Sequence, residues 1–124
     1  MWKKEKNIFR DHHSQVPVID IYDNFYRIYY STRIDGKSLP MFIDVNIDDP
    51  SIVINKSTKP ILTLGNPGSF DWAGIMPTDI INFENKKIYL IRDFAGIKPL
   101  YYGLNEKGLV FASQFDQIFK HNFF

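Results

Sequence analysis

The sequence predicts a mainly β protein: an antiparallel meander, followed by an antiparallel hairpin and a short C-terminal helix. Three observations lead to this fold class. Aromatic residues make up 16% of the 124-residue chain, and most stand in short alternating or β-branched runs that suit a pleated, half-buried surface. Turn-forming residues separate these runs at short intervals. Only the last segment has the three- and four-residue apolar spacing of a helix.

The expected meander occupies the first half of the chain. Its strands are predicted near residues 16–21, 25–32, 39–45 and 51–55, with turns at Asp23-Asn24, Asp35-Gly36 and Asp48-Asp49-Pro50. Residues 59–73 follow, and they contain too many proline and glycine residues for a regular element. Their apolar side chains indicate a packed loop rather than a disordered one.

Further strands are predicted near residues 79–83, 87–92, 99–104 and 109–112. The connections at 84–85 and 105–108 are typical of hairpins, and Gly108 suits a left-handed or bulge position. Ser113 can cap a short helix in which Phe115, Ile118 and Phe119 share one face.

Composition excludes several classes of protein. Fifteen basic and fourteen acidic side chains give a formal charge of +1, so no global field draws the chain to nucleic acid or to an anionic membrane. The chain has no cysteine, which excludes a disulfide framework, a thiolate zinc site and a cysteine nucleophile within it. No run approaches the roughly 20 apolar residues of a membrane span, and the start lacks the apolar run of a signal peptide. We therefore expect a soluble, cytoplasmic protein.

No cofactor or metal site is predicted. His12, His13 and the distant His121 lack metal-ligand spacing with acidic residues. The glycine-rich segment 65–68 is not followed by the Lys-Ser/Thr pair of a phosphate-binding loop.

One loop, residues 65–77, combines backbone flexibility with a carboxylate, Asp71, beside an indole, Trp72. In a sugar site the acid would accept hydrogen bonds from hydroxyl groups while the aromatic face packs on the ring. Alternatively, Asp71 caps a turn and Trp72 fills the core, and turn-capping acids are the commoner kind. The residues alone favour this second interpretation.

Three motifs in residues 8–90 occur in a recognisable order. They are His13-Ser14-Gln15-Val16-Pro17-Val18, the run 26–33 followed by Asp35-Gly36, and the loop 68–77 before Lys86-Lys87-Ile88-Tyr89-Leu90. This order resembles the opening blades of glycosidase-like five-bladed β-propellers, relatives of the glycoside hydrolases that act on furanosides, arabinosides and mannosides. Some of these proteins are associated with bacterial polysaccharide gene clusters.

The propeller resemblance implies incomplete propeller blades and a sugar pocket surrounded by carboxylates. Asp71 matches the acidic position and is the candidate catalytic acid, with His13, Arg33 and Trp72 as candidate substrate-binding residues. Glycoside cleavage needs a pair of carboxylates, and about two blades supply one such acid and leave open sheet edges. We therefore expect no hydrolysis by the chain alone.

The C-terminal third carries a second and more specific set of motifs, over residues 86–121. They are Arg92-Asp93, then Gly96-Ile97-Lys98-Pro99-Leu100-Tyr101-Tyr102-Gly103, then Gly108-Leu109-Val110-Phe111-Ala112-Ser113. The order is similar to the end of the glutaminase domain of asparagine synthases and other class II glutamine amidotransferases. A structural role explains these residues: Gly96 permits a reversal, Pro99 fixes the entry to a strand, and the Tyr101-Tyr102 pair packs with Phe111 across the hairpin.

That family's nucleophile is an N-terminal cysteine whose own α-amino group serves as base. Removal of Met1 here exposes Trp2, which has no nucleophilic atom. The resemblance therefore implies a scaffold hairpin without its reaction centre.

Together the motifs predict a mosaic, with a partial propeller over residues 1–88 and a partial amidotransferase segment over 86–124. The main functional hypothesis is a carbohydrate-active fragment fused to an amidotransferase-like tail and inactive by itself. One alternative is an accessory piece of a glutamine-hydrolysing asparagine synthase, and another is a sugar-binding module completed by oligomerisation. The candidate partners are thus a carbohydrate, a synthetase domain, or a second copy that pairs through open sheet edges.

Overall fold

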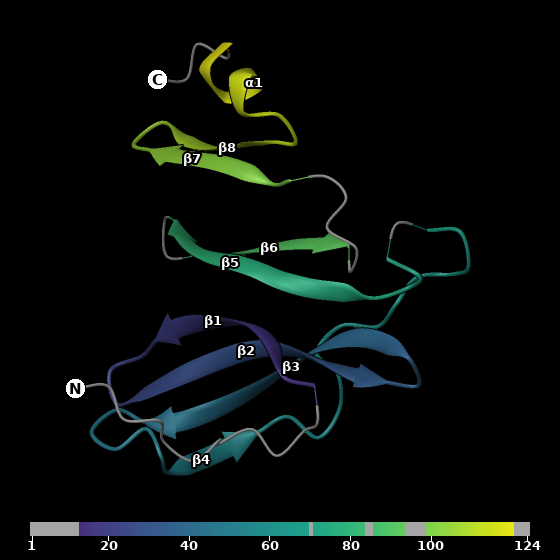
Figure 1. Cartoon of the computed structure of the whole chain (residues 1–124). Coiled ribbons are helices and arrows are strands. Elements are labelled where there is room, and N and C mark those ends of the chain that lie inside the picture. Colours follow the sequence, from purple (N-terminus) through teal and green to yellow (C-terminus); the bar gives the residue numbers. More distant parts are fainter. Residues whose placement is uncertain (1–12, 70, 84–85, 94–98, 121–124) are drawn as a thin grey trace, which may run out of the picture.

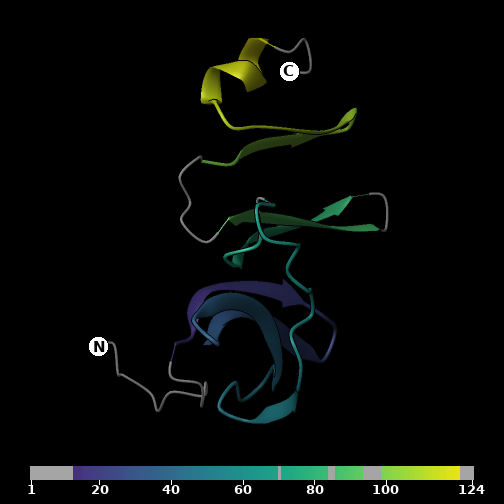
Figure 2. The same ribbon diagram turned by 90° about the vertical axis from the view of Figure 1, so that its right-hand side faces the viewer.

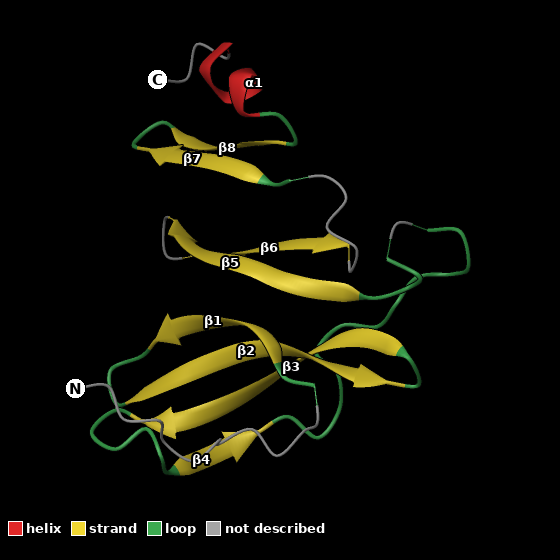
Figure 3. Cartoon of the chain, viewed as in Figure 1, coloured by secondary structure: helices red, strands yellow, loops and turns green. Residues whose placement is uncertain are grey.

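The computed structural model describes residues 13–69, 71–83, 86–93 and 99–120, and it shows stacked layers of antiparallel strands (Figure 1). The first layer is a four-stranded sheet, the second and third are hairpins, and a short helix lies beyond the third. Strands dominate the described part of the chain, as the colouring by secondary structure makes plain (Figure 3). The predicted mainly β, antiparallel fold is therefore confirmed.

The first layer is the expected meander. Its strands are β1 (Gln15–Ile21), β2 (Phe25–Ile34), β3 (Lys37–Asn46) and β4 (Val53–Lys56), and they lie in the order β1-β2-β3-β4. Asp35 and Gly36 both have positive φ, 51° and 77°, which is the backbone of a two-residue type I′ turn. This turn sets the register in which Ile34 pairs with Lys37 and Arg27 pairs with Asp44.

The main core lies on one face of the meander, which curls around it (Figure 2). Cross-strand pairing puts alternate residues of β2 and β3 on this face, where they form a cluster of Tyr30, Met41, Ile43 and Val45 with Tyr26 and Ile28 packed against it. Val45 is fully buried. Alternation then sends Arg27, Tyr29 and Phe42 to the opposite face.

The second layer covers that opposite face. It is the hairpin of β5 (Ile75–Phe83) and β6 (Lys86–Asp93), and β5 contacts β1, β2 and β3. Gly74 makes an isolated parallel bridge with Ser38, and the Ser31 hydroxyl donates to the carbonyl of Ile75 at 3.4 Å. These contacts anchor the start of the hairpin to the meander.

The third layer is the hairpin of β7 (Tyr101–Asn105) and β8 (Gly108–Ala112), followed by α1 (Phe115–Lys120). Gly108 has a φ of 142°, which agrees with the expected left-handed or bulge position. Ile118 of α1 is buried, whereas Phe115 and Phe119 are largely exposed. Thus only one of the three apolar residues predicted for the helix face is buried.

The strand predictions hold to within a few residues, apart from β5, which begins four residues earlier than predicted. The meander has β1 and β4 as its edges, and the described strands do not close into a barrel. The propeller blades inferred from resemblance therefore stay a prediction. The predicted turn at Glu84-Asn85, Gly96 and the histidines His12 and His121 lie outside the described residues. No helix in the described part of the chain is long and apolar enough to cross a membrane.

Candidate functional site

Charged side chains alternate in sign across the face of the meander that meets β5 and β6. Arg27 of β2 lies between Asp20 of β1 and Asp44 of β3, since it is the Cα partner of both. Its Nε and Nη2 groups donate to the two carboxylate oxygens of Asp44 at 2.7 and 2.9 Å, a bidentate pair. Asn55 of β4 donates to the same carboxylate at 3.2 Å, so this row of polar groups crosses the whole sheet.

Lys87 of β6 extends the row to the second layer. Its ammonium group donates to Oδ2 of Asp20 at 2.5 Å and lies 3.6 Å from the ring centroid of Tyr22. Burial acts to lower the pKa of Lys87, but hydrogen bonds to Asp20 and Tyr22 outweigh it and the pKa is raised. Asp20 is 3% exposed, so its carboxylate is nearly shut off from water and needs hydrogen-bond partners within the protein.

Two tyrosines connect the layers beside this row. The hydroxyl oxygens of Tyr29 and Tyr89 lie 3.3 Å apart, and the rings meet edge to face at 5.6 Å. Burial raises the pKa of Tyr29, and the hydrogen bond to Tyr89 raises it further. A phenol is protonated at neutral pH even at its ordinary pKa of 10.0, and the raised pKa extends that range, so Tyr29 can donate a hydrogen bond.

Arg27, the cation beside these tyrosines, is held by several contacts. The hydrogen bond to Asp44 raises the pKa of Arg27, against the opposing effect of burial, and the side-chain hydrogen bond with Tyr29 raises it again. The guanidinium also lies 4.3 Å from the ring centroid of Phe42, a cation–π contact. Arg27 is thus held by a carboxylate, a phenol and an aromatic face.

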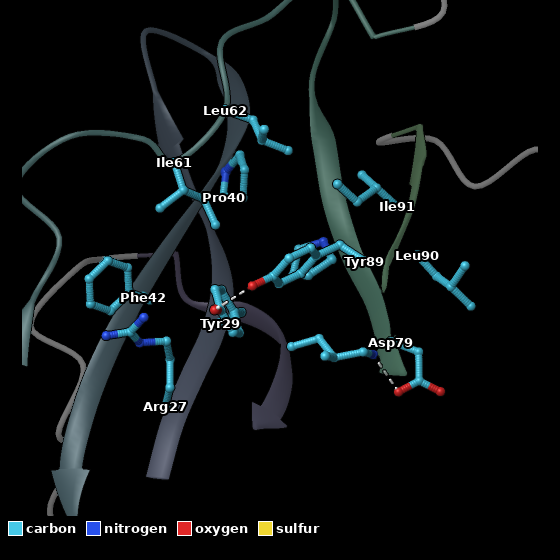
Figure 4. A pocket seen from close by; sticks show the side chains of 12 residues that line it. Arg27, Tyr29, Pro40, Phe42, Ile61, Leu62, Asp79, Tyr89, Leu90 and Ile91 are labelled. Atoms are coloured by element: carbon cyan, nitrogen blue, oxygen red, sulfur yellow. Dashed lines mark hydrogen bonds between the residues drawn. The ribbon is translucent and has the colours of Figure 1, made fainter. Parts of the chain in front are cut away.

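A cleft of about 320 Å³ opens between the meander and the β5–β6 hairpin, next to Arg27 and the two tyrosines (Figure 4). Most of its wall is apolar, and its lining residues are Arg27, Tyr29, Pro40, Phe42, Ile61, Leu62, Pro77, Asp79, Ile80, Tyr89, Leu90 and Ile91. In the close-up the carboxyl group of Asp79 points away from Tyr29 and Arg27. It accepts a hydrogen bond from the Tyr102 hydroxyl instead.

Asp71, the candidate catalytic acid, lies outside this cleft and stabilises its own loop. The Gly65 amide donates to Oδ2 at 3.0 Å and the Ser69 hydroxyl donates to Oδ1 at 2.6 Å. These contacts lower the pKa of Asp71, with the Ser69 hydroxyl as the largest cause. They are the turn-capping contacts of the alternative interpretation.

The other three sugar-site candidates lie at one end of the meander. His13 precedes β1, and Arg33 lies near the end of β2, where both are exposed. Trp72 is 46% exposed, with its ring centroid 5.8 Å from the ammonium of Lys37 at the start of β3. Trp72 therefore does not fill the core, and neither it, His13 nor Arg33 lines the cleft.

The amidotransferase-like motif residues are used in the fold. Arg92 and Asp93 end β6, opposite Met76 and Ile75. Pro99 precedes β7, whose first two residues point in opposite directions: Tyr101 packs edge to face on Phe115, and Tyr102 bonds to Asp79 of the second layer. The tyrosines therefore do not pack as a pair across the hairpin; only Tyr102 stands opposite Phe111.

Sequence reasoning missed the residues that build the cleft wall and the charged row. They are Asp20, Arg27, Tyr29, Asp44, Lys87 and Tyr89. A signal was present, since Asp20, Arg27 and Asp44 each stand between two apolar or aromatic residues of a strand, where a buried charge needs a partner. Among the described residues, no group of three or more His, Asp or Glu side chains is arranged to hold a metal ion.

One comparison with known proteins bears on the second and third layers. Residues 70–120 match the model of a glutamine amidotransferase domain. This amidotransferase-like segment runs from the loop before β5 to the end of α1, so it begins upstream of the resemblance at 86–121 and includes Asp71 and Trp72. No curated protein and no solved structure matches the chain. The propeller resemblance of residues 8–90 stays a prediction.

Proposed function

We propose that the chain is a mosaic whose amidotransferase-like segment, related to that of asparagine synthases, serves as a scaffold and does not hydrolyse glutamine with a residue of its own. The observation that carries this proposal is the use of the motif residues in folding. Tyr101 supports α1, Tyr102 bonds to β5, and Arg92 and Asp93 pair within the second hairpin. The chain also contains no cysteine to act as nucleophile.

The first part of the mosaic is proposed to be a blade-like, carbohydrate-related sheet that does not cleave glycosides by itself. The contacts of Asp71, which also lies inside the amidotransferase-like segment, support the absence of cleavage, because both of its oxygens are bound within its own loop. Glycoside hydrolysis would need a second acid across the sugar.

Enzyme assays test the absence of catalysis. Purified protein is incubated with glutamine and, separately, with nitrophenyl furanosides, arabinosides and mannosides, and the release of ammonia or nitrophenol is followed. We expect rates equal to those of heat-denatured protein. Turnover that survives repurification would overturn the proposal, and its loss in Asp71→Asn would identify the acid.

An accessory role beside a synthetase domain is a second candidate, favoured by the exposed aromatic side chains of the third layer. Phe111, Phe115 and Phe119 are 59–64% exposed, and Phe115 and Phe119 pack edge to face on each other. Isolated proteins rarely leave large apolar patches in water. Co-purification with the synthetase domain of a glutamine-hydrolysing asparagine synthase tests this role. Binding should weaken in Phe111→Ser and persist in Ile52→Ser, which alters an exposed residue of the first layer.

A sugar-binding module, completed by pairing of copies through the β1 or β4 edge, is the third candidate. The exposed indole of Trp72 beside Lys37 favours it, because an aromatic face next to a hydrogen-bond donor suits a pyranose or furanose ring. Calorimetry against a panel of sugars tests it, with Trp72→Ala as the disrupting variant and Phe111→Ala as the matched exposed-aromatic control. Absence of heat with every sugar would exclude this candidate.

A further inference from the structure

The cleft between the meander and the β5–β6 hairpin has a lining unlike that of a sugar site. Ile61, Leu62 and Ile91 form apolar walls, and the polar groups gather on one side at Arg27, Tyr29 and Tyr89 (Figure 4). Its volume of about 320 Å³ is at the small end of the range for ligand pockets, which are mostly apolar with a few placed polar groups.

The polar side of the cleft is rich in hydrogen-bond donors. The guanidinium of Arg27 has five N–H groups; Nε and Nη2 donate to Asp44, a further side-chain hydrogen bond joins the group to Tyr29, and the remaining N–H groups can serve a ligand. Tyr29 carries its phenolic proton at neutral pH, as a phenol with an ordinary or raised pKa does, and its bond to Tyr89 is long at 3.3 Å. The remaining charged residue of the lining, Asp79, points away and is bound by Tyr102.

We propose that this cleft binds a small aryl carboxylate, with its ring between the apolar walls and its carboxylate towards Arg27, Tyr29 and Tyr89. Phe42 and Tyr89 offer aromatic surfaces to the ring. The carboxylate would accept hydrogen bonds from the donor-rich side, and bonds to an ionised group are the stronger kind.

A free sugar fits this cleft poorly. Several of its hydroxyl groups would lie against Ile61, Leu62 and Ile91 without partners, and a buried polar group without a partner weakens binding. The binding site proposed here is therefore separate from the Trp72 surface. Tyr89 and Ile91 of its lining lie in the amidotransferase-like segment, but the test does not depend on whether that segment hydrolyses glutamine.

The experiment titrates 3-phenylpropionate into the intact chain and follows binding by calorimetry and by NMR shifts. A ligand of this size should bind with a dissociation constant on the order of 1 mM. The alcohol 3-phenylpropanol and glucose serve as comparison ligands. We expect 3-phenylpropanol to bind about tenfold more weakly and glucose not to saturate the site.

Variants then place the ligand in the cleft. Ile61→Trp and Leu62→Trp each fill the cleft from its loop wall and should abolish binding, with folding verified by thermal unfolding. Tyr89→Phe removes one hydroxyl and should weaken 3-phenylpropionate about three- to tenfold. Tyr101→Phe removes a hydroxyl from the third layer and should leave affinity unchanged.

Three results would overturn the proposal. They are the absence of saturable binding of 3-phenylpropionate up to its solubility limit, equal affinity for the acid and the alcohol, and unchanged affinity in a folded Ile61→Trp or Leu62→Trp variant. Saturable binding of glucose that these two variants abolish would also overturn it, because the cleft would then be a sugar site.

Discussion

The ammonium group of Lys87 lies 2.5 Å from Oδ2 of Asp20, across 67 positions of sequence, and joins β6 of the second layer to β1 of the first. The side chain of Asp20 is 1% exposed and that of Lys87 is 30% exposed. The pair therefore has a buried anion with a partly solvated cation, and the anion bears most of the cost if the pair is broken.

We expect Lys87→Met to destabilise the protein by roughly 3 kcal/mol, because it leaves the carboxylate of Asp20 buried without its cation. The double variant Asp20→Asn/Lys87→Met should recover part of that loss. Urea unfolding of the single and double variants measures both values. Equal stability of Lys87→Met and the unchanged protein would show that the pair contributes nothing to the layer contact.

Gly74 is expected to be intolerant of a side chain. Its φ is 137°, and an added Cβ would lie 2.8 Å from the backbone nitrogen of Ser38. Gly36→Ala is the matched control, since Gly36 also has positive φ but nothing within 4 Å of an added Cβ. Gly36→Ala should cost about 1 kcal/mol from backbone strain, and Gly74→Ala at least about 1 kcal/mol more. Chemical denaturation compares the stability of the two variants. Equal losses would mean that the backbone at Ser38 moves aside for the added methyl group.

The loop held by Asp71 should depend on pH. Its folded pKa is lowered from the ordinary 3.8, so the ionised form is favoured in the native loop. The stabilisation is fully present above pH 3.8 and is lost as the pH falls through the folded pKa. An NMR titration of the Gly65 amide, which donates to Asp71, reports the transition.

Ser69→Ala is the control for this titration. It removes the hydroxyl that is the largest cause of the shift, so the midpoint should move up towards 3.8. A midpoint that stays in place would assign the lowered pKa to the backbone amides instead.

Ile118 is the buried anchor of α1, at 4% exposure. Ile118→Ala should destabilise the third layer by about 2–4 kcal/mol and release the helix from β7 and β8. Gln117→Ala, at an exposed position of the same helix, should be neutral or slightly stabilising. Amide hydrogen exchange across α1 separates the two outcomes, and equal protection in both variants would contradict this role of Ile118.

Much of the fold could be predicted from local chemistry. Asp35 and Gly36 predict a turn from side-chain type alone, and the structure shows that this two-residue turn places Arg27 opposite Asp44. Asp71 illustrates the same strength, because turn capping is a local property and the sequence already favoured it. Within hairpins and loops, nearby residues determine the geometry.

The stacking of layers could not be predicted in this way. The contacts of Lys87 with Asp20 and of Tyr89 with Tyr29 join positions 67 and 60 residues apart, and neither turn chemistry nor periodicity encodes them. The cleft exists only because these layers meet. The residues that line it could therefore not be predicted from any single segment of the sequence. Trp72 is a second case, because its size favoured a place in the core whereas the structure places it at the surface.

The two faces of β6 carry residues with different neighbours. Lys87 and Tyr89 bond to the meander, while Leu90 stands opposite Asp79, which bonds to Tyr102 of the third layer. A strand with unlike surfaces depends on its register, because odd and even positions each keep their own partners. An insertion or deletion of one residue within β6 would exchange the two surfaces and turn Lys87 and Tyr89 away from the meander, whereas the same change in the loop before β5 would leave these two contacts in place.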